Sequence, residues 1–200
     1  MKRLSLAVAV SLLLVACGGG SALTAKSLGR IMPSDTDAPP GTQIDAESSG
    51  PKVELEEFVT DTEVRIRLSQ LGFRVAWTTS FATANYVPDK DKAPVGSAFY
   101  GTFAVILKDE KAAADGFDFY VRRLTGRAKD LTPIVMQDLG EEVFSFRFSA
   151  LDDTPLPGLA LLWRVRNALF SLVGVGSPSP DPKVARALAA KIAARAEKAG

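Results

Sequence analysis

The chain has 200 residues, with 24 lysines and arginines against 23 aspartates and glutamates and a formal net charge of +1. Such a chain is long enough for one domain with a proper core, and it is too close to neutral to be steered onto nucleic acid. It contains no histidine and a single cysteine, Cys17, which excludes Ser-His-Asp and Cys-His catalysis and histidine metal sites.

Residues 1–16 have the three-part layout of an export signal. Lys2 and Arg3 form a basic head, residues 4–16 form an apolar run, and a glycine run follows Cys17. A membrane span needs about 20 consecutive apolar residues, so this run is too short to be a good one. We predict a signal peptide over residues 1–16, and its removal leaves the mature chain at a formal charge of −1.

Leu14, Val15, Ala16 and Cys17 resemble the bacterial lipobox. The resemblance implies that Cys17 becomes the first residue after cleavage and carries a diacylglycerol and usually a further acyl chain such as palmitate. Each buried methylene of such chains contributes about 0.8 kcal/mol to membrane attachment. The alternative is an ordinary secretory signal, which leaves Cys17 as a free thiol in an oxidising compartment. The lipobox places the protein at the cell membrane, anchored on the extracytoplasmic side, and leaves inner and outer membrane open.

Residues 17–52 are predicted to be the acylated N-terminus followed by a flexible tether. Residues 23–32 can form a short helix ended by Pro33, but the stretch from Pro33 to Pro51 is rich in Pro, Gly, Ser and Asp. Those residues are typical of turns and open loops, and few apolar groups are available to order the segment. We therefore expect residues 53–200 to form the single folded domain.

The first part of that domain is predicted to be a helix and two strands. Over residues 59–71, Val64, Leu68 and Leu71 share a helical face and Gly72 suits its C-terminal stop, although the alternation of Val64, Ile66 and Leu68 leaves a strand open. Residues 73–83 and 96–109 alternate as strands do and are expected to pair.

The second part is predicted to be a helix, three strands and a final helix. Asp109 is a suitable N-cap for a helix that runs to about Leu124, and Asp181 with Pro182 begins an alanine-rich helix whose buried seam is Val184, Leu188 and Ile192. The predicted strands span residues 142–150, 159–166 and 168–175. The last two favour a buried hairpin over a membrane span, because Arg164, Arg166 and Asn167 lie at the centre of this apolar stretch.

This order, α-β-β-α-β-β-β-α, predicts an α+β fold in which helices flank an antiparallel sheet. From about residue 55 to residue 199 the chain resembles bacterial surface lipoproteins with a PsbP-like domain, the LpqN-type lipoproteins, and the extracellular sensor domains of receptor kinases. The matching stretches are "SQLGFRVAWTTSF", "DLGEEVFSFRF" and "LLWRVRNALFSLVGVG". The resemblance implies a scaffold and an extracytoplasmic role, and it brings no catalytic residue with it. The chain lacks the cysteine pair of some sensor domains and has no kinase portion.

Charged side chains offer several candidate sites, each with a simpler structural interpretation. Glu141 and Glu142 are neighbours on a predicted strand and should point to opposite faces, so they are not expected to act on one substrate atom. Asp152 and Asp153 fit a turn, and the acidic loops supply too few oxygens for calcium. A basic cluster fits either a helix end or contact with anionic headgroups or wall polymers; its members are Arg122, Arg123, Arg127 and Lys129. We predict no catalytic residue, no metal and no cofactor.

The most suggestive binding residues are aromatic. Trp77 and Tyr100 lie on predicted strands, where aromatic side chains either pack in the core or line a groove. Tyr86 lies in the loop "NYVPDKDKAPV", which is longer than a strand connection needs, and it is the predicted partner anchor with Lys90 and Lys92 at the rim.

The sequence therefore predicts a membrane-anchored, non-enzymatic binding or accessory module. Its expected partners are membrane lipid through Cys17 and a protein, an envelope polymer or a small apolar ligand through the domain, with the oligomeric state left open. The alternative is an envelope hydrolase that works through carboxylates or a serine with a lysine base.

Overall fold

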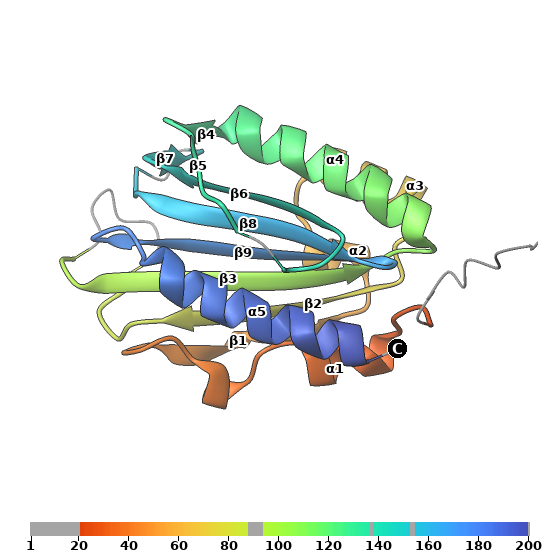
Figure 1. The fold of residues 1–200 in the computed structure, drawn as a ribbon, viewed down its shortest axis with the longest axis horizontal. Helices are drawn as coiled ribbons and strands as arrows, with labels where there is room; N and C mark the ends of the chain where they lie inside the picture. The colour runs from red at the N-terminus through yellow and green to blue at the C-terminus, as the bar shows by residue number, and fades with distance from the viewer. Residues whose placement is uncertain (1–20, 88–93, 137, 153–154, 200) are drawn as a thin grey trace, which may run out of the picture.

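The computed structural model describes residues 21–87, 94–136, 138–152 and 155–199 (Figure 1). Within these residues, seven strands form one antiparallel sheet in the order β1-β2-β3-β9-β8-β6-β5. The strands are β1 (Gln43–Lys52), β2 (Val75–Ala82), β3 (Ser97–Ile106), β5 (Thr132–Pro133), β6 (Glu142–Phe148), β8 (Gly158–Val165) and β9 (Ala168–Ser177). A separate pair joins β4 (Ala128–Lys129) to β7 (Ala150–Leu151). The prediction of an α+β fold with an antiparallel sheet and flanking helices is confirmed.

Helices cover both faces of the sheet. α1 (Ala25–Ile31) and α5 (Pro182–Lys198) pack on one face, and α5 lies across the strands in Figure 1. α2 (Leu55–Phe58), α3 (Thr62–Gln70) and α4 (Glu110–Arg127) pack on the opposite face. A 3-10 turn, η1 (Asp35–Asp37), follows α1. Among the described residues, none of the helices combines the length and the apolar character that crossing a bilayer requires.

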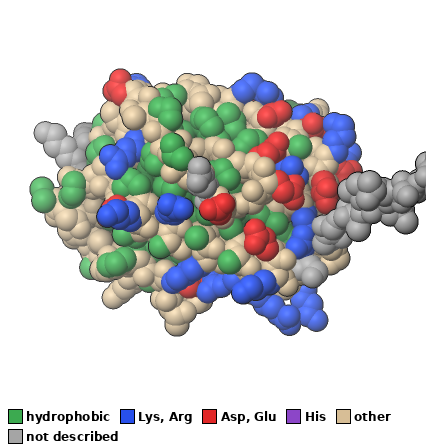
Figure 2. Space-filling model, in the orientation of Figure 1, with side chains coloured by type: hydrophobic (Ala, Val, Ile, Leu, Met, Phe, Trp, Pro, Cys, Tyr) green, Lys and Arg blue, Asp and Glu red, His purple; other side chains and the backbone are tan. Residues whose placement is uncertain are grey.

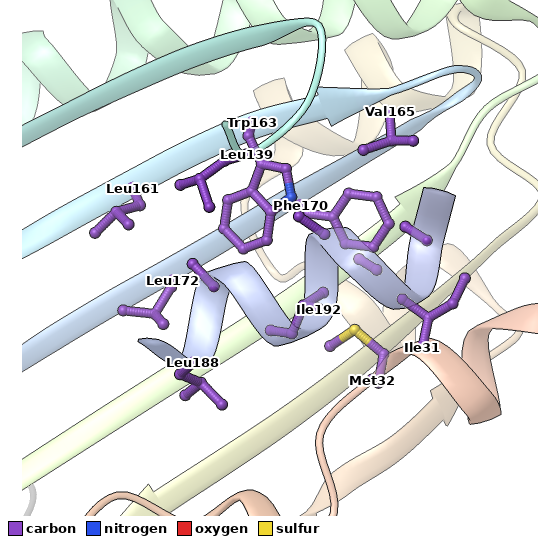
Figure 3. Close-up of a cluster of buried hydrophobic side chains, with 14 of the residues drawn as sticks. Ile31, Met32, Leu139, Leu161, Trp163, Val165, Phe170, Leu172, Leu188 and Ile192 are labelled. Carbon is purple, nitrogen blue, oxygen red and sulfur yellow. The ribbon is translucent and has the colours of Figure 1, made fainter. Parts of the chain in front are cut away.

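The β8–β9 hairpin supplies the centre of the core on both faces. Successive side chains on a strand alternate between faces, and here Trp163 of β8 points toward α5 whereas the neighbouring Leu162 packs toward α4. The ring of Trp163 stacks on Phe170 of β9 with centroids 5.5 Å apart, and Ile192 of α5 belongs to the same buried cluster (Figure 3). This arrangement confirms the predicted buried hairpin. A strand that is buried on both faces needs apolar side chains at successive positions, and the continuous apolar run provides them.

The predicted helix ends agree with the structure where local signals set them. Asp61 accepts a hydrogen bond from the Val64 amide at 3.1 Å and begins α3, and Asp109 accepts one from the Ala112 amide at 2.7 Å and begins α4. Gly72 follows α3 with a φ of 69°, a conformation that glycine adopts without strain. Strands β2 and β3 pair as expected.

The predicted tether over residues 17–52 is wrong for its larger part. Leu23, Leu28 and Ile31 are buried in the core beneath α5, and residues 43–52 form edge strand β1 paired with β2. β1 needs few apolar side chains because its contribution is mainly backbone hydrogen bonding at the sheet edge, and none of its side chains is fully buried. The domain therefore includes residues 21–52, and α1 and β1 precede the predicted element order.

An ion pair fixes the N-terminal segment to the final helix. The side chain of Asp37 in η1 is almost fully buried and accepts hydrogen bonds from Arg195 at 2.8 and 2.9 Å. The Arg195 guanidinium is the main cause that lowers the Asp37 pKa to about 2, and the amide of Ser34 and the amine of Lys191 act in the same direction against desolvation. The side of α5 that carries Lys191 and Arg195 is thus partly a contact surface for η1.

Candidate ligand-binding groove

A groove of about 400 Å³ lies on the sheet face that carries α4. Its floor comes from the neighbouring strands β2, β3 and β9, and its walls come from the segment around α2 and α3 and from the C-terminal half of α4. Its lining includes Thr78, Ser80, Gly101 and Phe103 from β2 and β3, Ser171 and Val173 from β9, and Phe58, Asp61, Tyr120, Arg123, Leu124 and Arg127 from the walls. We call this the α4 groove.

Small side chains on adjacent strands create the hollow. Ser80 of β2 lies directly opposite Gly101 of β3, and Gly101 lies opposite Val173 of β9. Ser171 of β9 lies opposite the larger Phe103. Because side chains on one face of neighbouring strands lie side by side, serine and glycine there leave room that leucine or phenylalanine fills elsewhere in the core.

The hydroxyl groups of Ser80, Tyr120 and Ser171 are among those that line the groove, on mainly apolar surroundings. Ser171 is 2% exposed and Tyr120 is 8% exposed, and Ser80 lies beside them on the floor. Burial raises the pKa of Tyr120, with Asp61 adding to the rise and Arg123 opposing it, so its hydroxyl stays protonated and can both donate and accept. The groove therefore offers hydrogen bonds at fixed points on an apolar surface.

Paired charges form the rim of the α4 groove. Arg123 is 17% exposed and pairs with Asp61 and with Glu63, the latter at 2.8 Å, while Arg127 pairs with Asp152. The amide of Val64 is the main cause that lowers the pKa of Asp61, and Arg123 adds to it. Because the cations of the rim are matched by carboxylates, an uncharged ligand suits the groove better than an ionised one.

The aromatic residues predicted to bind a partner are not brought together. Trp77 is half-buried beside α1, and Tyr100 is buried near Gly174, so both face the α1/α5 side of the sheet, away from the groove. Burial, with the charge of Asp181, raises the pKa of Tyr100. Their placement favours core packing over ligand contact.

Tyr86 is connected to the floor of the groove through Phe99. Its ring stacks on Phe99 with centroids 5.2 Å apart, and Phe99 in turn leans over Gly101 in the floor. The predicted rim residues Lys90 and Lys92 lie outside the described residues, as does Cys17. Tyr86 is therefore part of a small aromatic cluster that borders the α4 groove.

Two charged candidates are arranged differently from the sequence prediction. Glu141 and Glu142 were expected to point apart, but both contact the guanidinium of Arg164, Glu142 at 2.8 Å. The expectation fails because β6 begins only at Glu142, and Glu141 still belongs to the turn that Gly140 makes with a φ of 137°. The basic cluster at the end of α4 is also divided, since Arg123 and Arg127 are ion-paired whereas Arg122 and Lys129 are exposed.

The hydrolase alternative needs a serine beside a lysine base or convergent carboxylates. Among the described residues, no lysine amine contacts a serine hydroxyl, and no group of three or more acidic, cysteine or histidine side chains is placed to hold a metal ion.

The sequence analysis did not predict the α4 groove. The available signal was the series of small residues at one-face positions of three strands, Ser80, Gly101 and Ser171.

The fold, unlike the sequence, resembles a solved structure. No protein-family model and no curated protein matches the sequence. The crystal structure of the extracellular domain of PknH from Mycobacterium tuberculosis superposes with a TM-score of 0.56 and 9% sequence identity, over 90% of this chain and 100% of that one. At this identity the likeness concerns the fold.

Proposed function

We propose that this chain is a non-enzymatic, extracytoplasmic binding module whose α4 groove takes a small, uncharged and mainly apolar ligand. The observation that carries the proposal is the groove of about 400 Å³, in which the hydroxyls of Ser80, Tyr120 and Ser171 stand on a mainly apolar lining. Small-molecule sites are usually clefts of this size with a few fixed polar groups. The likeness to an extracellular domain supports an extracytoplasmic location, and the sequence resemblance to LpqN-type, PsbP-like lipoproteins agrees with it.

The groove is tested by filling it. We expect Ser171→Leu to weaken binding of Nile red, an uncharged apolar dye, by roughly tenfold or more, because the new side chain occupies the hollow that Ser171 leaves open. Dye fluorescence measured against protein concentration gives the affinity. Ser171→Ala is the matched control: it keeps the hollow and should bind the dye as the unsubstituted protein does. A folded Ser171→Leu variant with undiminished dye binding contradicts the proposed site.

The membrane anchor at Cys17 belongs to the same proposal and is supported by the lipobox resemblance. If Cys17 is acylated, Cys17→Ser should move the protein from the membrane fraction to the soluble fraction or leave it as an uncleaved precursor. Two or three acyl chains hold a protein on a bilayer, whereas an unmodified serine contributes nothing to attachment. Cell fractionation with intact-mass measurement checks the result. A Cys17→Ser protein that is still processed and still membrane-bound contradicts lipid anchoring.

A further inference from the structure

Cations surround the point where the N-terminal segment enters the domain. Lys26 and Arg30 on α1 and Arg195 and Lys198 on the last turns of α5 line a shallow hollow of about 480 Å³. Arg166, in the turn between β8 and β9, contacts the backbone just before α1 and the last turn of α5. Figure 2 shows Lys and Arg side chains gathered at the lower right of this view, over α1 and the end of α5. We call this surface the basic end.

The basic end also holds the start of the chain in place. The Arg166 guanidinium donates to the carbonyl of Ser21 at 2.9 Å and to the carbonyl of Glu197 at 2.7 Å. Asn167 binds both the amide and the carbonyl of Leu23, whose side chain is 2% exposed. The described chain therefore begins at a fixed position on the basic end and cannot swing away from it without breaking buried contacts.

Most of these cations are available for an external partner. Lys26, Arg30 and Lys198 are exposed and form no ion pair within the described residues. Arg195 is neutralised by Asp37, and Glu197 contributes an exposed carboxylate in the same turn as Lys198. The basic end thus keeps a positive excess although the mature chain as a whole is close to neutral.

We propose that the basic end lies against the anionic phospholipid headgroups of the membrane. The inference rests on the proposed anchor for its geometry: the segment from Cys17 to Ser21 spans at most about 14 Å when fully extended. That reach keeps the basic end within one to two screening lengths of the bilayer surface, where each lysine or arginine is attracted to anionic lipid. The α4 groove is built from other elements, α3 and α4, so docking through α1 and α5 leaves it open.

The test uses the mature chain, residues 17–200 with Cys17→Ser, which keeps every described residue and has no acyl chain. It is sedimented with vesicles of phosphatidylcholine alone and of an equal mixture of phosphatidylcholine and phosphatidylglycerol. We expect binding to the mixed vesicles only, and loss of that binding at high salt. The combined variant Lys26→Glu, Arg30→Glu, Lys198→Glu should reduce binding by more than about tenfold.

A matched control changes the charge equally at other exposed sites: Lys183→Glu and Arg186→Glu at the opposite end of α5, with Arg122→Glu on α4. This control should bind the mixed vesicles nearly as well as the unsubstituted chain. Protection of Lys26 and Lys198, but not Lys183, from an amine-reactive reagent on mixed vesicles gives a second measurement that needs no variant. Equal binding to both kinds of vesicle, or equal losses in the two combined variants, overturns the proposal. Because the tested chain is unacylated, these results do not depend on whether Cys17 is lipidated or the groove binds a ligand.

Discussion

A mature chain trimmed to begin at Lys52 should lose its cooperative unfolding transition. The deletion removes Leu23, Leu28, Ile31 and Met32 from the core and exposes the surfaces of α5 and β2 that they cover. Each fully buried side chain of this size contributes about 1.5–3 kcal/mol, so the loss is comparable with the roughly 5–15 kcal/mol of a whole domain. It also leaves β2 as an unpaired edge.

Urea titration followed by tryptophan fluorescence measures this effect, because Trp163 is fully buried in the core cluster that the deletion opens. The matched control is a chain that begins at Ser21, which keeps every described residue and should retain the full transition. A sharp transition in the chain that begins at Lys52, with a midpoint near that of the control, would show that α1 and β1 add little to the domain.

Asn167→Ala should destabilise the protein by about 3–5 kcal/mol. The Asn167 side chain is 3% exposed, accepts from the amide of Leu23 at 2.8 Å, and donates to the carbonyls of Leu23 and Leu107, both at 3.2 Å. Alanine leaves these three buried backbone groups unpaired, and each unpaired group costs about 1–3 kcal/mol. The largest local effect should be faster hydrogen exchange at the Leu23 amide.

Asn85→Ala is the corresponding control for that variant. Asn85 is exposed and makes one long hydrogen bond, at 3.5 Å, to the carbonyl of Val95. Its replacement should change the free energy of unfolding by no more than about 0.5 kcal/mol, as for an ordinary surface site. If the two alanine variants unfold at the same urea concentration, Asn167 does not hold the N-terminal segment in the way that its contacts indicate.

The sequence predicts best those elements whose signals are local. α4 and α5 carry capping aspartates and an apolar stripe within their own residues, and the β8–β9 hairpin carries a continuous apolar run. The contacts that place α1 are of a different kind. Leu23 and Asn167 are 144 positions apart, so no window of sequence contains both, and a segment rich in Pro, Ser and Asp gives no local sign of a buried partner.

The α4 groove escaped prediction for a related reason. Ser80, Gly101 and Ser171 look unremarkable on their own strands, and they form a hollow only because β9 pairs with β3, a strand more than 60 residues earlier in the chain. Predicting the groove requires the strand order, which single-sequence periodicity does not provide. The aromatic residues attracted attention instead, and of these Trp77 and Tyr100 pack on the other face.

The two outer strands of the sheet are poor templates for pairing with another copy. β1 shifts register between Asp45 and Gly50, where the Thr78 hydroxyl donates to the Ser48 carbonyl and the Ser80 amide donates to the Ser49 hydroxyl. Pro51 follows in the same strand, and at the opposite edge β5 is only Thr132 and Pro133. Irregular or very short edges with proline hinder strand addition from a neighbouring molecule. Such edges therefore protect the protein against aggregation by pairing of sheets from neighbouring copies.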